Sequence, residues 1–117
     1  MVSATLERVQ AIEREQRILR YVVAQARRLL DPDRIWLFGS RARGLATRLS
    51  DVDIAFQLPA EAHASWARFV SDTEESLPAL AELDLVDVDR CGPELAEEIR
   101  RTGQLLYERG YGDAPAR

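Results

Sequence analysis

The sequence predicts an α/β fold in which helices pack on a small mixed β-sheet. Segments with helical periodicity alternate along the chain with short apolar or alternating segments typical of strands. Proline or glycine lies at most of the boundaries between them. The chain has 117 residues, 46% of them hydrophobic, which is enough for one core but not two. We therefore expect one domain over residues 1–117, with an N-terminal helix over 1–30 and a catalytic core over 35–107.

The first thirty residues predict one long amphipathic helix. Arginine and glutamate fill most of its remaining surface, which predicts a solvated face, with a partner-docking face as the alternative. Asp31-Pro32 ends the helix, because proline disfavours the helical conformation in the residue before it. The apolar positions recur at helical spacing: Val9, Ile12, Leu19, Val22, Val23, Ala26 and Leu30.

Two strands are expected next. The wholly apolar run Ile35–Phe38 predicts a buried strand, closed by Gly39 and Ser40. Residues 41–45 suggest a helical turn and 47–50 a loop. Residues 51–58 then alternate between apolar and other side chains, so they predict a half-buried strand with Asp51 and Asp53 on one face near its start.

The remaining chain predicts a helix over 60–77, a strand over 83–88, a helix from Pro93 to Gly103 and a short strand over 104–107. Pro59 and Pro78 bound the first of these helices, and Pro93 suits a first helical position. The tail after Gly110 is expected to fray. In the helix over 60–77, the expected core positions are Trp66, Phe69, Val70 and Leu77.

Composition excludes several mechanisms. All sixteen basic residues are arginine, so the chain has no lysine for a Schiff base or for a phosphate-binding lysine. One cysteine, Cys91, allows neither an intramolecular disulfide nor a cysteine zinc cluster. No apolar stretch suggests a membrane span or a secretion signal, so we expect a cytoplasmic protein with no membrane partner.

Charge is distributed unevenly along the chain. Residues 1–50 hold ten Arg against five acidic residues, a charge of +5, whereas residues 51–117 hold six Arg against fifteen, a charge of −9. The net charge of −4 argues against direct nucleic-acid binding. A basic N-terminal part and an acidic C-terminal part suit a binding site for an anionic small molecule or a charged surface that binds a partner.

Two carboxylates begin the second strand. Residues i and i+2 of a strand point the same way, so Asp51 and Asp53 converge on one point. Two such carboxylates repel each other unless a cation or a proton lies between them, and Mg²⁺ prefers oxygen ligands of this kind. Alone, the pattern is common by chance. The chain repeats it at Asp87-Val88-Asp89, and a solvated strand end is the simpler interpretation of either pair taken by itself.

The turn before that strand adds an anion site. Gly39 and Ser40 follow the apolar strand directly, and a strand-to-helix turn offers free backbone N–H groups and a hydroxyl to a phosphate. Arg41 and Arg43 flank the same turn and can add charge-assisted hydrogen bonds. A phosphate cradle beside a metal-binding carboxylate pair is the arrangement that phosphoryl or nucleotidyl transfer needs.

The segments GSRARG and SDVDIA, with ten residues between Ser40 and Asp51, resemble the DNA polymerase β-type nucleotidyltransferase superfamily. More narrowly, they resemble its minimal nucleotidyltransferases, over about Ile35 to Tyr107. The resemblance implies the polymerase β-like fold, phosphate binding by Gly39 and Ser40, and two Mg²⁺ ions held by Asp51 and Asp53.

The resemblance also implies a third carboxylate on a later strand, which contributes to metal binding and activates the acceptor hydroxyl. Asp84 is preferred because the family's strand commonly reads apolar-Asp-apolar-Val at this place, and Asp87 is the alternative. Strand parity puts these two residues on opposite faces, but the sequence leaves open which face meets Asp51 and Asp53.

The function implied by the resemblance is that of an adenylyltransferase antitoxin. Such proteins transfer AMP from ATP to a tyrosine of a helical nuclease toxin of the HEPN type, encoded nearby. Two alternatives stay open: a non-catalytic subunit that neutralises a partner by binding it, and nucleotidyl transfer to a small molecule. Assembly with copies of itself or with another protein is compatible with each of these.

Other chemically active residues receive structural interpretations. His63, the one histidine, lies outside the motifs and is expected at the surface or at a helix cap. Cys91 is expected to be a buried structural thiol. We expect core positions for Trp36 and Trp66, and structural roles for Tyr107 and Tyr111.

Overall fold

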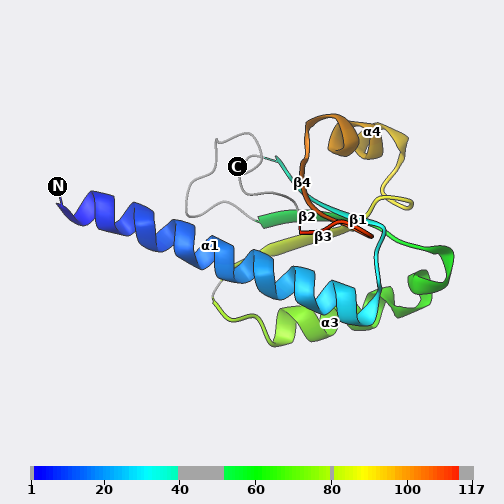
Figure 1. Ribbon diagram of the computed structural model, residues 1–117, viewed down its shortest axis with the longest axis horizontal. Coiled ribbons are helices and arrows are strands. Elements are labelled where there is room, and N and C mark those ends of the chain that lie inside the picture. Colours follow the sequence, from blue (N-terminus) through cyan, green and yellow to red (C-terminus); the bar gives the residue numbers. More distant parts are fainter. Residues whose placement is uncertain (1, 40–51, 80, 114–117) are drawn as a thin grey trace.

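The chain folds around one mixed β-sheet with helices on both faces (Figure 1). The computed structural model describes residues 2–39, 52–79 and 81–113. In chain order the elements are α1 (Val2–Leu29), β1 (Arg34–Phe38), β2 (Val52–Gln57), the 3₁₀ helix η1 (Ala60–Ser65), α3 (Trp66–Glu75), β3 (Leu83–Asp87), α4 (Pro93–Thr102), β4 (Gln104–Glu108) and β5 (Gly112–Asp113).

The strand order is β3-β2-β1-β4-β5. β1 pairs antiparallel with both β2 and β4, β4 pairs antiparallel with β5, and β2 pairs parallel with β3. A parallel pair needs a crossover connection, which η1 and α3 supply between β2 and β3. The prediction of an α/β fold with a mixed sheet is therefore confirmed.

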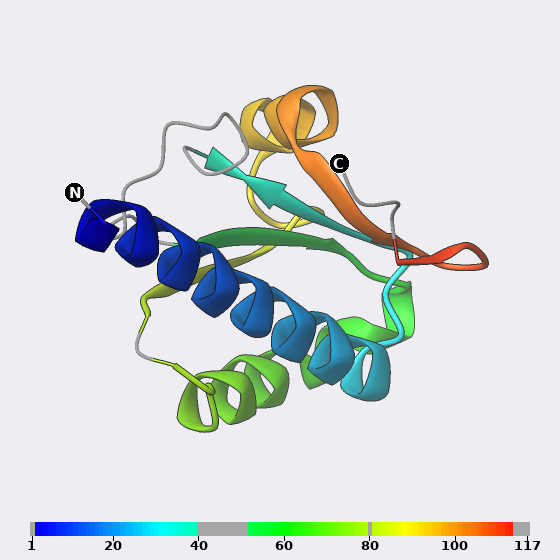
Figure 2. The same ribbon diagram turned by 60° about the vertical axis from the view of Figure 1, so that its left-hand side comes forward.

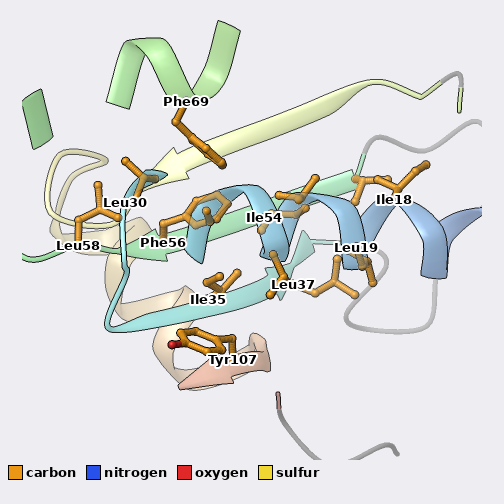
Figure 3. Packing of buried hydrophobic residues seen from close by; sticks show 14 of the residues in the cluster. Ile18, Leu19, Leu30, Ile35, Leu37, Ile54, Phe56, Leu58, Phe69 and Tyr107 are labelled. Carbon is orange, nitrogen blue, oxygen red and sulfur yellow. The ribbon is translucent and has the colours of Figure 1, made fainter. Parts of the chain in front are cut away.

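Helices α1 and α3 cover one face of the sheet, and α4 packs against the other (Figures 1 and 2). The face toward α1 and α3 carries the larger core, in which Ile18 of α1 and Leu30, just after that helix, meet Ile35, Ile54 and Phe56 of the strands (Figure 3). The second core, on the opposite face, joins side chains of β1, β2 and α4 with the residue that follows β3: Trp36, Phe38, Ala55, Val88, Ala96 and Ile99. Alternation along β1 and β2 thus supplies both cores at once.

The N-terminal half of α1 differs from expectation. Val9 and Ile12 belong to the apolar stripe that the sequence places at helical spacing, but both are exposed, as is Leu6. A helix of 28 residues is about 42 Å long, so its first turns extend past the sheet that its later turns cover (Figure 1). The buried part of its apolar stripe begins at Ile18.

Two further boundaries differ from the sequence prediction. The expected helix over 60–77 consists of the 3₁₀ segment η1 followed by α3, a distinction that a short apolar pattern does not encode. In the tail expected to fray after Gly110, Gly112–Asp113 instead form β5, which pairs Asp113 with Tyr107, while residues 114–117 lie outside the described residues. Gly110 permits that reversal because its φ is +89°.

Within the three described ranges, every helix is too short or too polar to cross a lipid bilayer.

Candidate active site

Three strand ends meet at one edge of the sheet. Because β1 is antiparallel to β2 and β2 is parallel to β3, the last residue of β1 lies beside the first residues of the other two strands. Asp53 pairs in register with Phe38 on one side and with Asp84 on the other. The fold therefore places the carboxylate of β2 next to a carboxylate that is 31 positions later in the chain.

Asp53 and Asp84 lie on the same face of the sheet. Ala55 of β2 and Val86 of β3 belong to the core under α4, and strand alternation puts Asp53 with Ala55 and Asp84 with Val86. Neighbouring strands lie about 4.8 Å apart, so register partners on one face are direct neighbours. Asp53 is half-buried and Asp84 is exposed, which leaves the pair open to solvent on one side.

This pair fits a hard divalent cation. Two carboxylates side by side repel each other unless a positive charge lies between them, and carboxylate oxygens are the ligands that Mg²⁺ prefers. The pair is therefore chemically suited to hold Mg²⁺.

Gly39 completes the described part of the site. Its φ is +74°, in the left-handed region that favours glycine. A Cβ at this position would overlap Oδ2 of Asp53 and lie 3.2 Å from its Cγ. The absence of a side chain at Gly39 thus leaves room for the Asp53 carboxylate.

Four predicted site residues lie outside the described part of the chain: Ser40, Arg41, Arg43 and Asp51. Their expected roles stay predictions.

Asp87, the alternative third carboxylate, occupies a different place. Its register partner is Phe56, and its buried side chain contacts His63 and the backbone of Asp89 instead of Asp53. Of the two candidates on β3, Asp84 is the one that lies beside Asp53.

His63 is partly exposed in η1, and its imidazole belongs to an ion cluster that the surface-or-cap prediction did not include. Its Nδ1 lies 2.7 Å from Oδ2 of Asp87, and its Nε2 lies 3.4 Å from Oδ2 of Asp89. The sequence carried one signal for this cluster, the second Asp-x-Asp at 87–89, but no spacing rule connects it to residue 63.

Cys91 is partly exposed and not buried as predicted, although its thiol donates to the carbonyl of Val88. Burial is nevertheless sufficient to raise the pKa of this thiol above its usual value, because desolvation disfavours the thiolate. A cysteine with a raised pKa is a poor nucleophile at neutral pH, so nothing in its surroundings suggests catalysis.

The aromatic residues divide into packed and exposed ones. Trp36 is buried, and Trp66 stacks edge-on against Phe56 with ring centroids 5.5 Å apart, as predicted for core positions. Tyr107 is buried beneath the guanidinium of Arg27, 4.9 Å from the ring centroid. Tyr111 is 83% exposed, so the structural role predicted for it is wrong.

The fold resembles several solved structures. A toxin–antitoxin complex with AMP-PNP aligns with a TM-score of 0.58 and 23% identity, covering 79% of this chain and 74% of that one. A candidate nucleotidyltransferase from Sulfolobus solfataricus aligns with a TM-score of 0.59 and 22% identity, covering 91% and 94%. A mutant of the toxin–antitoxin MntA-HpeT aligns with a TM-score of 0.57 and 25% identity, covering 76% and 71%. A search of curated proteins gave no significant match.

The family profile described as Polymerase beta, Nucleotidyltransferase matches residues 12–111. That range contains the sheet edge with Gly39, Asp53 and Asp84 and all but the exposed N-terminal turns of α1. Membership of a nucleotidyltransferase family supports an enzymatic function for the chain. The chain belongs to the polymerase beta nucleotidyltransferase family.

Proposed function

We propose that this chain is a Mg²⁺-dependent adenylyltransferase that acts as an antitoxin. It transfers AMP from ATP to a tyrosine of a partner, a HEPN-type RNase toxin encoded nearby, and it does so as one cytoplasmic domain over residues 1–117. The observation that carries the catalytic part is the register of β2 with β3, which sets Asp53 beside Asp84 next to Gly39.

In this proposal the site divides into a phosphate-binding turn and a carboxylate group. Gly39 and Ser40 hold the triphosphate through backbone N–H groups and a hydroxyl, with Arg41 and Arg43 beside them. Two Mg²⁺ ions would be held by the carboxylates of Asp51, Asp53 and Asp84. When bound, these ions would neutralise charge on the phosphate oxygens.

The reaction is an in-line displacement at the α-phosphorus. The acceptor tyrosine gives up its hydroxyl proton with help from the exposed carboxylate of Asp84, and its oxygen attacks the α-phosphorus of ATP. The bond between the α-phosphorus and the bridging oxygen breaks, and pyrophosphate leaves. Ser40 and the two arginines stabilise the charge on the departing group.

The choice of a protein acceptor has two supports. Two of the similar structures are toxin–antitoxin assemblies, and one of them contains AMP-PNP. In addition, residues 2–39, 52–79 and 81–113 form one sheet with its covering helices, which provides no separate acceptor-binding domain among them. An acceptor supplied by a partner fits both observations.

A second candidate is a binding subunit that neutralises its partner by complex formation alone. The exposed apolar side chains of Leu6, Val9 and Ile12 favour a docking role for the first turns of α1. Nucleotidyl transfer to a small molecule is the remaining alternative, and no described contact favours it.

The discriminating experiment incubates the purified chain with labelled ATP, Mg²⁺ and the product of the neighbouring gene. We expect label on a tyrosine of the partner, loss of its RNase activity, and neither effect with Asp53→Asn or Asp84→Asn. If those variants still neutralise the partner while no label is transferred, the binding-subunit interpretation replaces the enzymatic one.

A further inference from the structure

A second polar cluster lies at the opposite edge of the sheet from Asp53 and Asp84. It joins His63 of η1 to Asp87, the last residue of β3, and to Asp89 in the turn that follows. Asp87 pairs with Phe56, three positions along β2 from Asp53, so the cluster is roughly 10 Å along the strands from the candidate active site. Nothing in the proposed reaction uses it.

One of the two contacts between His63 and the carboxylates lacks a proton when the imidazole is neutral. A neutral imidazole carries one N–H, and both carboxylates can only accept hydrogen bonds when ionised. The 2.7 Å contact assigns that proton to Nδ1, which donates to Oδ2 of Asp87. The lone pair of Nε2 then faces Oδ2 of Asp89 across 3.4 Å, an arrangement that is favourable only with a cation between the two atoms.

Asp87 is suited to hold the imidazole in that tautomer. Its side chain is 4% exposed, its Oδ1 accepts the backbone N–H of Asp89 at 3.0 Å, and Arg90 approaches its Oδ2 at 3.8 Å. A buried carboxylate on one imidazole nitrogen, with the other nitrogen directed at a ligand, is the usual support of a metal-binding histidine.

The distance between the facing atoms also suits a metal ion. Two ligands about 2.1 Å from a tetrahedral ion are separated by roughly 3.4 Å, which matches the gap between Nε2 and the Asp89 oxygen. Imidazole with carboxylate favours Zn²⁺ and related transition ions over Mg²⁺, which prefers oxygen ligands alone. The side chains of His63 and Asp89 are 17% and 43% exposed, so solvent can supply the remaining ligands.

We propose that His63 Nε2 and the Asp89 carboxylate form a transition-metal site of the zinc class, with Asp87 as the positioning residue for His63. An ion bound there ties η1 to the segment between β3 and α4. It stabilises that end of the fold without entering the nucleotidyl transfer reaction, so the site is distinct from the one proposed for Mg²⁺.

The test is thermal unfolding of the full chain with ZnCl₂ at pH 7.5, without nucleotide or partner. At a tenfold excess of zinc over its Kd we expect a rise in Tm of about 5 °C. The rise should be absent with His63→Gln and Asp89→Asn, and with MgCl₂ in place of zinc. It should persist with Glu74→Gln, a change of an exposed carboxylate outside the cluster, and with Cys91→Ser, which removes the nearby thiol.

A second readout uses the one histidine of the chain. Zinc should shift the nitrogen resonance of Nε2 while Nδ1 keeps its proton. An equal thermal response in His63→Gln, or its loss in Cys91→Ser, would overturn the proposal. So would a cluster that responds only to acidification, because a proton would then be the bridging cation. Since none of these readouts measures AMP transfer, their failure is separate from a failure of the proposed function.

Discussion

Replacing Gly39 with alanine tests how the turn after β1 and the Asp53 carboxylate depend on each other. The φ of +74° costs an L-residue about 1 kcal/mol, and the added Cβ overlaps the end of the Asp53 side chain. A carboxylate can rotate away at little cost in stability, but it must move by about 1 Å, and a shift of that size at reacting groups costs about 10²-fold in rate.

Gly110→Ala is the matched control. Gly110 has a similar φ of +89°, but a Cβ there would meet no heavy atom of the described residues within 4 Å, so we expect the backbone cost alone. Urea unfolding should show both variants destabilised by about 1 kcal/mol, whereas AMP transfer should fall about 100-fold in Gly39→Ala alone. Equal activity in the two variants would refute the argument that Gly39 makes room for the Asp53 carboxylate.

Further predictions follow from individual contacts. Asp84→Asn should abolish AMP transfer and leave Tm unchanged, because the Asp84 side chain is exposed. Asp87→Asn should lower the free energy of unfolding by about 1–3 kcal/mol and preserve AMP transfer, because the Asp87 side chain is buried. Activity assays and melting curves together check both variants. Phe69→Ala should cost about 3–5 kcal/mol in urea unfolding, since its buried ring packs 5.2 Å from that of Phe56. Thr73→Val should stabilise by about 1 kcal/mol in the same assay, because its buried Oγ1 has no hydrogen-bond partner among the described residues. Alkylation of Cys91 at pH 8 should be slower than that of a free thiol, because burial raises the pKa of Cys91. The thiol then stays protonated to a higher pH in the folded chain than in the unfolded chain. Its contribution to the free energy of unfolding is therefore lost as the pH rises through the alkaline range.

The positions of β1 and β2 could be predicted from the sequence, because each strand has its own local pattern of apolar residues. The apolar run before Gly39 and the alternation after residue 51 match β1 and β2 to within a residue. Both patterns arise from the pleat of a strand that is buried on one or both faces, so they need no knowledge of the partner strand.

The pairing of the strands could not be predicted from the sequence. Parity separated Asp84 from Asp87, but the choice of face depended on the register of β2 with β3, a contact between distant segments. The same limit hid the ion cluster of His63, whose partners come from β3 and the turn after it. The bounds of α1 were predicted closely, but the sequence did not show which of its turns are buried, because amphipathic spacing continues in α1 beyond the sheet that it covers.

The most direct test of the central claim is the intact mass of the partner after incubation with ATP, Mg²⁺ and the purified chain. The account predicts an increase equal to one AMP, on a tyrosine, that disappears with Asp53→Asn, with Asp84→Asn or with excess EDTA. An unchanged partner mass with the wild-type chain, or full modification by both variants, would contradict the assignment of nucleotidyl transfer to these two neighbouring carboxylates.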